Sequence, residues 1–401
     1  MQLAKLSRSA MRALPKPATL TIACGLALAA SQVSAATINM GDDASFSIGA
    51  GLRMSYNNVE HGAPNGSSSS NDFSIDNARI YLSGRVNKMI GATLNTERSG
   101  SGNTPDGIRI MDAYAQFEPM PEFNIWAGRM LPASDRANLD GPFYLNVWEY
   151  PFVSNYPNLA VGRDNGVQVW GKLMSNKFTY VAGAFKGHNS VTGGSNQADH
   201  LLYAGRLAYA FWDAEPAPAY YTGSTYYGSN DILTVGVAGM FEKDGVGVAA
   251  TPGDYKAYNV DVLMEKKLGG GALTLEGAYY KYALGSVLDC NSGEPGSPAC
   301  PAAGADANVG GQVKSKAYYV TAAYLIPGKV GWGQFQPFTR YQKLSRDVSS
   351  TTKTQLDVGV NYVIKGHNAR ITAVFSKVKD DQLPSPKNDS NKFILGTQLQ
   401  F

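Results

Sequence analysis

The last eleven residues of the chain alternate between apolar and polar side chains. The apolar residues of one parity are Phe393, Leu395, Leu399 and Phe401. The other parity carries Gly396, Gln398 and Gln400, with Ile394 as the one mismatch. Because alternate side chains of a β-strand point to opposite faces, the segment predicts a strand with one apolar and one polar face. Chain termini usually fray, but the last strand of a closed barrel pairs with the first, with lipid outside and water inside.

The N-terminal 35 residues have the pattern of a secretory signal peptide. Their charged residues are Lys5, Arg8, Arg12 and Lys16, all basic. An uncharged apolar run follows at 18–30, and small residues precede Ala35. We therefore expect cleavage after Ala35, which leaves 36–401 as one barrel domain. A membrane anchor or a lipoprotein acylated at Cys24 are the alternatives, but the apolar run is shorter than the ~20 residues that span a bilayer.

Charge and composition exclude several classes of protein. The formal net charge of the whole chain is +3, and loss of the four basic residues of the signal peptide leaves the mature chain near −1. No basic excess remains to neutralise phosphates, so we expect no nucleic-acid partner. After residue 36 the sequence has no apolar run of about 18 residues, so we expect no transmembrane helix. The 44 Gly and 23 Tyr residues instead fit a barrel whose strands are half polar and whose aromatic residues gather at the membrane interfaces.

Turn residues divide the mature sequence into about sixteen short alternating segments, and an even number suits bacterial barrels. The expected strands are 45–57, 72–86, 88–99, 107–118, 122–130, 163–173, 177–186, 199–212, 230–242, 254–268, 271–284, 314–326, 331–345, 353–365, 368–379 and 391–401. In the first of them Ile48 and Leu52 share one face and Arg53 lies on the other. The sequence therefore predicts an all-β fold, a transmembrane antiparallel β-barrel of about sixteen strands.

The links between these strands differ in length. Short links at 87, 268–271 and 365–367 are expected at the periplasmic rim, and long polar links are expected outside the cell. The long links are 60–71, 186–198, 213–230 and 285–313.

One link, 131–162, has a different composition. It is apolar and aromatic, with Phe143, Tyr144 and Phe152 close together and four prolines along its length. Because apolar side chains at this density favour burial, we expect the link to fold into the barrel and to narrow the pore. The candidate constriction residues are Asp135, Arg136, Asp140, Trp148 and Glu149. An external cap or a subunit contact is the alternative.

Two cysteines remain in the mature chain. Cys290 and Cys300 lie in a stretch rich in Gly, Pro, Ser and Ala at 285–311. Two thiols in an exported loop favour a disulfide, and a pair of free thiols is the alternative. Without a nearby histidine they provide too few ligands for a metal site, and we expect no cofactor.

Several segments resemble Gram-negative outer-membrane porins, most closely the phosphate-selective porin O and P group. The resemblance rests on Asp-Asn-Ala-Arg-Ile-Tyr-Leu-Ser-Gly-Arg at 76–85, Asp-Ala-Tyr-Ala at 112–115, Trp-Ala-Gly-Arg at 126–129, Gly-Arg-Asp-Asn-Gly at 162–166 and the final Phe401. It covers most of the mature chain. It implies a trimeric sixteen-stranded barrel with a constriction loop, in contact with outer-membrane lipid and lipopolysaccharide. It also implies that Phe401 is part of the signal read by the barrel-assembly machinery.

Porins of this group line the lumen with basic residues, and the inward parity here carries six arginines. They are Arg53, Arg79, Arg85, Arg206, Arg340 and Arg370. Arginine presents a fork of donors to phosphate or carboxylate oxygens, so the six form a candidate pore-lining track for anions. Arginines that pair with lumenal acids are the alternative. One charge at ~4 Å contributes about 1 kcal/mol in water, so we expect passive diffusion of small solutes and ions with at most a mild preference for anions such as phosphate.

Other functions have less support. The four histidines, His61, His188, His200 and His367, fall in expected loops or at strand ends, so we expect them to be solvated. We find no catalytic triad, zinc motif or phosphate-binding loop and expect no enzyme. A secreted β-sandwich that binds carbohydrate does not explain the outward apolar parity in strand after strand. A barrel that serves as an adhesin or as a sleeve around a partner, with its pore plugged, remains an alternative.

Overall fold

The computed structural model describes residues 36–41, 43–99, 107–154, 162–187, 200–248, 251–283, 308–309, 312–347 and 349–401. All of them belong to one compact unit, Ser31–Phe401. The expected signal peptide and the expected disulfide between Cys290 and Cys300 lie outside the described residues and stay predictions. No helix in the described ranges is long and apolar enough to cross a membrane.

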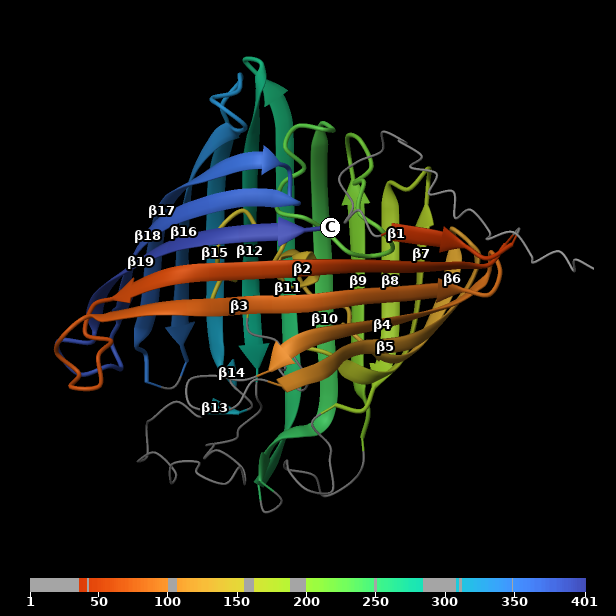
Figure 1. The fold of residues 1–401 in the computed structure, drawn as a ribbon. Coiled ribbons are helices and arrows are strands. Elements are labelled where there is room, and N and C mark those ends of the chain that lie inside the picture. Colours follow the sequence, from red (N-terminus) through yellow and green to blue (C-terminus); the bar gives the residue numbers. More distant parts are fainter. Residues whose placement is uncertain are drawn as a thin grey trace, which may run out of the picture. The chain divides into compact units, whose positions relative to one another are not determined.

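One antiparallel sheet closes into a barrel (Figure 1). Of its 17 strands, the short β1 (Ala36–Asn39) only adds to the edge of β2, and the other sixteen form the wall. The wall strands are β2 (Ser45–Val59), β3 (Ser70–Arg85), β4 (Ile90–Ser99), β5 (Gly107–Met120), β6 (Phe123–Met130), β7 (Asp164–Leu173), β8 (Phe178–Phe185), β9 (Leu202–Ala210), β10 (Ile232–Val248), β11 (Thr251–Leu268), β12 (Gly271–Ala283), β15 (Ser315–Leu325), β16 (Gln334–Arg346), β17 (Thr352–Lys365), β18 (Ala369–Asp380) and β19 (Asp389–Gln400). A separate two-stranded sheet is made by β13 (Asn308–Val309) and β14 (Gln312–Val313). Strands β19 and β2 close the ring, where Leu399 pairs with Leu52, so the expected sixteen-stranded barrel is confirmed.

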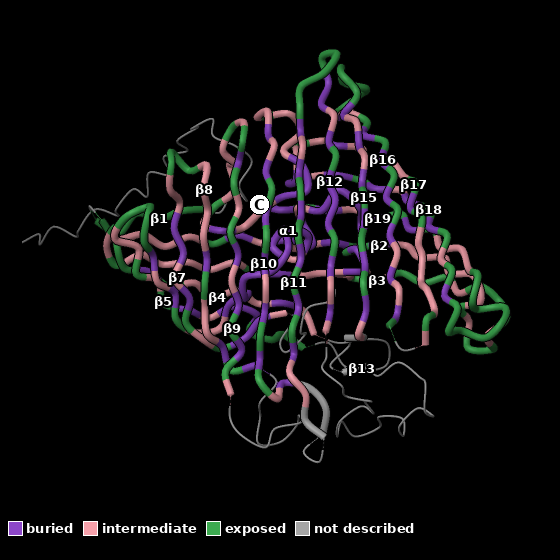
Figure 2. Tube along the Cα trace, turned by 180° about the vertical axis from the view of Figure 1, so that it is seen from behind, coloured by how far each residue is buried: buried purple, intermediate pink, exposed green. Residues whose placement is uncertain are grey.

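The wall strands alternate between exposed and buried positions, as the sequence predicts (Figure 2). In β19 the outward side chains Phe393, Leu395 and Leu399 are exposed, whereas Gln398 is buried. Ile394, the one mismatch, faces inward and is only 1% exposed. It packs against Val147 and Trp148, which belong to the link that enters the barrel. The departure from alternation therefore marks a contact between the wall and that link.

The constriction loop, residues 131–162, folds into the barrel over its described part, 131–154 and Gly162. Phe143, Trp148 and Val153 are 1%, 2% and 0% exposed. The loop contains one short helix, α1 (Arg136–Asp140). Removing apolar surface from water stabilises this path by about 25 cal/mol per Å². The expected inward folding is confirmed, and an external cap is excluded.

The link 211–231 between β9 and β10 corrects one expectation. Successive links of an antiparallel barrel alternate between the two rims, and this link lies on the rim that also carries 86–89, 121–122, 174–177, 269–270 and 366–368, here called the short-turn rim. The sequence analysis placed 213–230 with the long links outside the cell, which is wrong because length alone does not decide the rim. The link is long because it folds back into the barrel, where Tyr220 and Thr225 are 2% and 0% exposed. We call 211–231 the inward segment.

Candidate functional site

The six arginines of the expected basic track come from five wall strands: Arg53 on β2, Arg79 and Arg85 on β3, Arg206 on β9, Arg340 on β16 and Arg370 on β18. Five of them are at most 7% exposed: Arg53, Arg79, Arg206, Arg340 and Arg370. All of these arginines form hydrogen bonds or ion pairs with other groups of the interior. They fall into groups with different partners and do not form one continuous row.

Four arginines hold the constriction loop by its backbone, and one of them, Arg53, donates to the carbonyl oxygen of Trp148. Arg206 Nη1 donates to the carbonyl oxygen of Ser134 over 3.3 Å, and Arg340 Nη1 donates to that of Glu149 over 2.8 Å. Arg370 Nη1 donates to that of Leu145 over 2.5 Å. Hydrogen bonds from charged donors contribute about 1.5–3 kcal/mol each. Arg206 and Arg340 also pair with Asp261 and Asp357, which balances part of their charge in the interior.

The wall from β2 to β4 carries a second arrangement, in which arginines alternate with acids and amides. Arg53 donates to Asn77 over 2.9 Å, and Asn77 donates to Glu97 over 3.0 Å. Glu97 also accepts from Arg79 Nε over 2.5 Å. The Arg53 guanidinium lies 3.9 Å from the ring centroid of Trp148 and donates to its carbonyl oxygen. This wall therefore contacts the constriction loop at Trp148.

Arg163, which the sequence analysis did not include among the arginines of the track, extends this wall. It lies just before β7, and its Nε donates to Asp112 on β5 over 2.9 Å. Asn95 on β4 donates to the same carboxylate over 2.9 Å. Arg163 begins the expected strand 163–173, but it has the parity of the outward Val167, so strand parity did not place it inside the barrel. The family-like stretch at 162–166 was the signal available in the sequence.

Closer to the short-turn rim, Arg85 pairs with Glu118. Trp126 Nε1 donates to the other oxygen of that carboxylate over 2.8 Å. Arg79, Arg85 and Arg163 are thus each matched by an acid, which offsets their charge, whereas Arg53 has Asn77 and Trp148 as its partners. This arrangement is the alternative in which lumenal arginines pair with acids.

Two tyrosines approach this wall from opposite rims. Tyr150 belongs to the constriction loop and is 38% exposed. Burial raises the pKa of Tyr150, and the charges of Arg79, Arg163 and Arg53 lower it. Tyr221 belongs to the inward segment; burial and Asp112 raise its pKa to about 12, and Arg163 lowers it. The charge of Arg163 therefore acts on two side chains from different segments.

The other constriction residues expected from the sequence are all anchored. Asp135 accepts from Ser154 over 3.0 Å and from the Tyr280 hydroxyl. Asp140 accepts from Ser224 over 2.7 Å. In a neighbouring part of the loop, Trp148 Nε1 donates to Asp76 over 2.9 Å, and Lys392 pairs with Glu149 over 2.5 Å.

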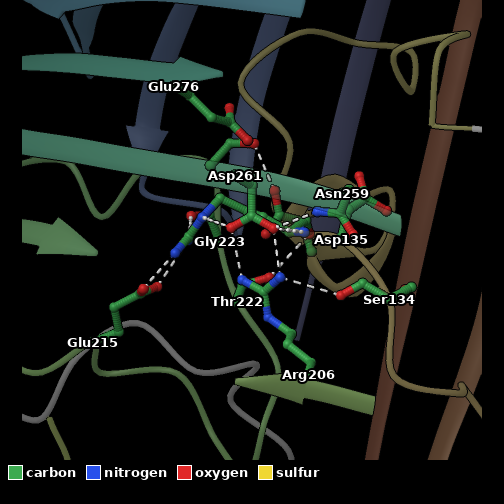
Figure 3. Close-up of polar contacts among 12 residues, drawn as sticks. Ser134, Asp135, Arg206, Glu215, Thr222, Gly223, Asn259, Asp261 and Glu276 are labelled. Carbon is green, nitrogen blue, oxygen red and sulfur yellow. Dashed lines mark hydrogen bonds and ion pairs between the residues drawn. The ribbon is translucent and has the colours of Figure 1, made fainter. Parts of the chain in front are cut away.

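Arg136 joins the two segments, and Figure 3 labels its partners Glu215 and Gly223. Arg136 is 0% exposed and donates to both oxygens of Glu215 over 2.9 and 2.5 Å. Its Nη1 also donates to the carbonyl oxygen of Gly223 over 3.1 Å. Figure 3 places Asp261 and Arg206 beside this group, with Arg206 Nη2 2.7 Å from Asp261. Buried ions need partners of this kind, because an unpaired charge in the interior is strongly destabilising.

His367 corrects the expectation that the histidines are solvated. It lies between β17 and β18 and is 2% exposed. Its Nε2 lies 2.9 Å from the carbonyl oxygen of Thr225. Burial and the charge of Arg370 lower its pKa to about 3. The inward segment covers this turn, which its position near a strand end could not reveal.

Comparisons with known proteins agree with this architecture. A family model described as "Phosphate-selective porin O and P" matches residues 46–401, and a search of curated proteins finds no match. The barrel is similar to the anion-selective porin from Comamonas acidovorans, with a TM-score of 0.58 and 11% identity over 90% of this chain and 100% of that chain. It is also similar to the outer membrane channel DcaP of Acinetobacter baumannii (TM-score 0.57, 13% identity, 91% and 99% covered). A trimer form of OmpT of Vibrio cholerae matches as well (TM-score 0.53, 12% identity, 90% and 100% covered). At these identities the solved structures indicate a common fold and nothing finer.

Proposed function

The chain belongs to the phosphate-selective porin O and P family, and we propose that it passes small hydrophilic solutes and ions across the outer membrane by passive diffusion. The observation that carries the proposal is the uneven filling of the barrel. Inward side chains on β11 to β15 are covered by the constriction loop and the inward segment, and Tyr255, Tyr280 and Tyr319 are at most 2% exposed. Several of those on β3 to β5 keep partial exposure, namely Tyr81, Ser83, Arg85, Thr93, Asn95, Gln116 and Glu118, although Arg79, Glu97, Asp112 and Tyr114 are buried. The open route therefore follows β3 to β5.

The charge along this route supports a weak preference for anions such as phosphate. Three arginines near this route each pair with a carboxylate: Arg79 with Glu97, Arg163 with Asp112 and Arg85 with Glu118. A paired arginine attracts a passing anion less than a free one, since the two fields partly cancel. With about 1 kcal/mol for one charge at ~4 Å in water, we expect a permeability ratio of anions to cations of a few-fold at most.

The test is the conductance of the purified protein in a planar lipid bilayer. A potassium chloride gradient gives the reversal potential for chloride, and potassium phosphate gives it for phosphate. We expect stepwise increases in current as single channels insert, and a reversal potential whose sign indicates that anions are more permeant than cations. Absence of any channel would sink the proposal and would favour the second candidate, a barrel plugged by its own segments that serves as an adhesin or a sleeve. The loop and segment buried inside the wall are the observation behind that candidate.

Membership in a porin family favours a channel over an enzyme. We also propose export with cleavage after Ala35, assembly as a homotrimer, and contact with lipid and lipopolysaccharide. The signal-peptide pattern of residues 1–35 supports that cleavage site. The match to OmpT in its trimer form supports the homotrimer. N-terminal sequencing of the mature protein and its native mass in detergent test these two points, and deletion of Phe401 tests its role as an assembly signal.

A further inference from the structure

The inward segment crosses the barrel interior from one wall to another. Near its middle, the Tyr220 hydroxyl donates to the carbonyl oxygen of Leu131 over 2.9 Å, and Gln168 on β7 donates to that hydroxyl over 2.5 Å. Further along, Thr225 lies against His367, between β17 and β18. A turn that only joined β9 to β10 would not reach these strands. The segment therefore belongs to the interior of the pore.

Glu265 on β11 fixes the far end of the segment. Its carboxylate accepts from the Thr225 hydroxyl over 2.6 Å, from the Tyr226 backbone N–H over 3.0 Å and from the Gly228 backbone N–H over 2.7 Å. Thr274 on β12 donates to it as well, over 2.9 Å. A buried carboxylate that accepts several bonds holds the backbone of the segment in one position.

The segment also interlocks with the constriction loop. Besides the pair of Arg136 with Glu215, the Thr222 hydroxyl donates to the carbonyl oxygen of Arg136 over 3.0 Å. The Ser224 backbone N–H donates to that of Tyr144 over 3.1 Å. Two segments from opposite rims thus form one packed unit inside the barrel, and neither can move without breaking bonds to the other.

Tyr221 is a partly exposed side chain of the inward segment, and its ring centroid lies 6.2 Å from that of Trp126 on β6. It is stacked on Tyr220 with ring centroids 4.8 Å apart, and has Asp112 and Arg163 as its charged neighbours. It also lines a cavity of about 30 Å³ that Lys172 borders on the side of the short-turn rim. A water needs about 10–15 Å³ of such volume, so there is room for about two waters beside the ring.

We propose that the inward segment is a second constriction element and that Tyr221 is one of its specificity-determining residues. In this proposal Tyr221 from the short-turn rim and Tyr150 from the constriction loop, which both interact electrostatically with Arg163, bound the route from the two rims. A hydrated small anion that passes Arg163 then meets a phenol from each segment. The proposal rests on the proposed channel function and adds that the narrowest part is built from both rims.

The first experiment uses charge placed at Tyr221. Cys290 and Cys300 are replaced by Ser in the full chain, Tyr221→Cys is added, and channels in a planar bilayer are treated with a negatively charged methanethiosulfonate. We expect loss of most of the single-channel current after modification. The matched control is Tyr258→Cys, because Tyr258 is 54% exposed on the outer face of β11; its modification should leave the current unchanged. Modified Tyr221→Cys channels with unaltered current, or a thiol that does not react in the open channel, would overturn the proposal.

A second pair of variants separates the effect of the Tyr221 ring on the width of the pore from the effect of its hydroxyl on hydrogen bonding. Tyr221→Ala should raise the single-channel conductance and admit larger poly(ethylene glycol) probes, whereas Tyr221→Phe should keep the conductance of the wild type. Heat-modifiable mobility in gels checks that each variant is folded. If Tyr221→Ala is folded and conducts like the wild type, the second constriction does not exist. If the wild type itself shows no channels, the channel function fails instead.

Discussion

Arg136 on the constriction loop forms a two-pronged ion pair with Glu215 on the inward segment, which enters the barrel from the opposite rim. The side chain of Arg136 is fully buried, and that of Glu215 is 13% exposed. Only this pair joins charged side chains of the two segments within the described residues. It therefore couples the position of one constriction element to the other.

Breaking this pair should destabilise the barrel. Removal of one partner of a buried pair leaves an uncompensated charge, which typically costs about 3–5 kcal/mol. We expect Arg136→Met and Glu215→Gln each to lower the midpoint temperature of heat-modifiable mobility. The double variant should lose less than the sum of the two, because neither charge is then left alone. Additive losses would indicate that Arg136 relies on Asp261 and the Gly223 carbonyl rather than on Glu215.

Removal of Arg79 and Arg85 should turn selectivity toward cations. Both arginines lie on β3, where Arg79 is buried and Arg85 is partly exposed, and their removal leaves the charges of Glu97 and Glu118 without their arginine partners. We expect Arg79→Ala with Arg85→Ala to lower the permeability ratio of anions to cations by a few-fold, at about 1 kcal/mol for each charge. The reversal potential under a salt gradient measures this ratio. Lys316→Ala, at an exposed position of β15, is the control; an unchanged reversal potential in the double variant would remove both arginines from the route.

Asp135 should make stability depend on pH. Burial raises its pKa to about 7, the bond from Tyr280 lowers it, and the nearby charges of Asp261 and Arg206 raise and lower it, respectively. An aspartate in an unfolded chain titrates near ~3.9. The folded barrel therefore binds more protons than the unfolded chain between about pH 4 and pH 7, so its stability falls as the pH rises through this window and is level above it.

Protonation of Asp135 contributes on the order of 4 kcal/mol at most to the free energy of unfolding. We expect the midpoint temperature of the wild type to be lower at pH 8 than at pH 5, and Asp135→Asn to reduce this difference. Asp72→Asn, at an exposed position of β3, is the control. An equal pH dependence in wild type and Asp135→Asn would show that Asp135 is ionised throughout.

Gly396 should tolerate no larger residue. A Cβ at this inward position of β19 would lie 2.6 Å from the ring of Trp148 on the constriction loop. Either the ring or the loop must shift, and overpacking of this kind typically costs about 1–3 kcal/mol. Gly396→Ala should therefore lower the midpoint temperature and alter the conductance. Gly205→Ala is the matched control, because its Cβ would meet its nearest atom at 3.6 Å; equal behaviour of the two variants would indicate that Trp148 is not packed at Gly396.

The strands and the constriction loop could be predicted from local patterns. Alternation along β19 places Leu395 and Leu399 outside and Gln398 inside, since the period of two is a property of the strand itself. The density of aromatic residues around Phe143 likewise indicated burial. The path of 211–231 was not predicted, although the segment contains six aromatic residues. Its contacts with Glu265, Arg136 and other interior groups hold it inside, and they join residues far apart in the sequence.

The six arginines show the same division more sharply. Parity alone placed Arg53 and Arg370 inside the barrel, and both lie there. Whether an inward arginine borders the route or holds a loop depends on what lies opposite. Arg53 meets Trp148 across 95 positions of the chain, and Arg370 meets Leu145 across 225. Local periodicity carries no information about such distant partners, so Arg163 was not included among the inward arginines.

The sequence by itself determined that this chain forms a closed barrel with an apolar exterior and a polar interior, because apolar and polar residues alternate along each strand. The tertiary structure decided how much of the interior is filled and by which segments. It set Ile394 against Val147, covered His367 with the inward segment and joined Arg136 to Glu215. These contacts depend on the three-dimensional closure of the ring, since only closure brings both rims and the opposite walls within reach of one side chain.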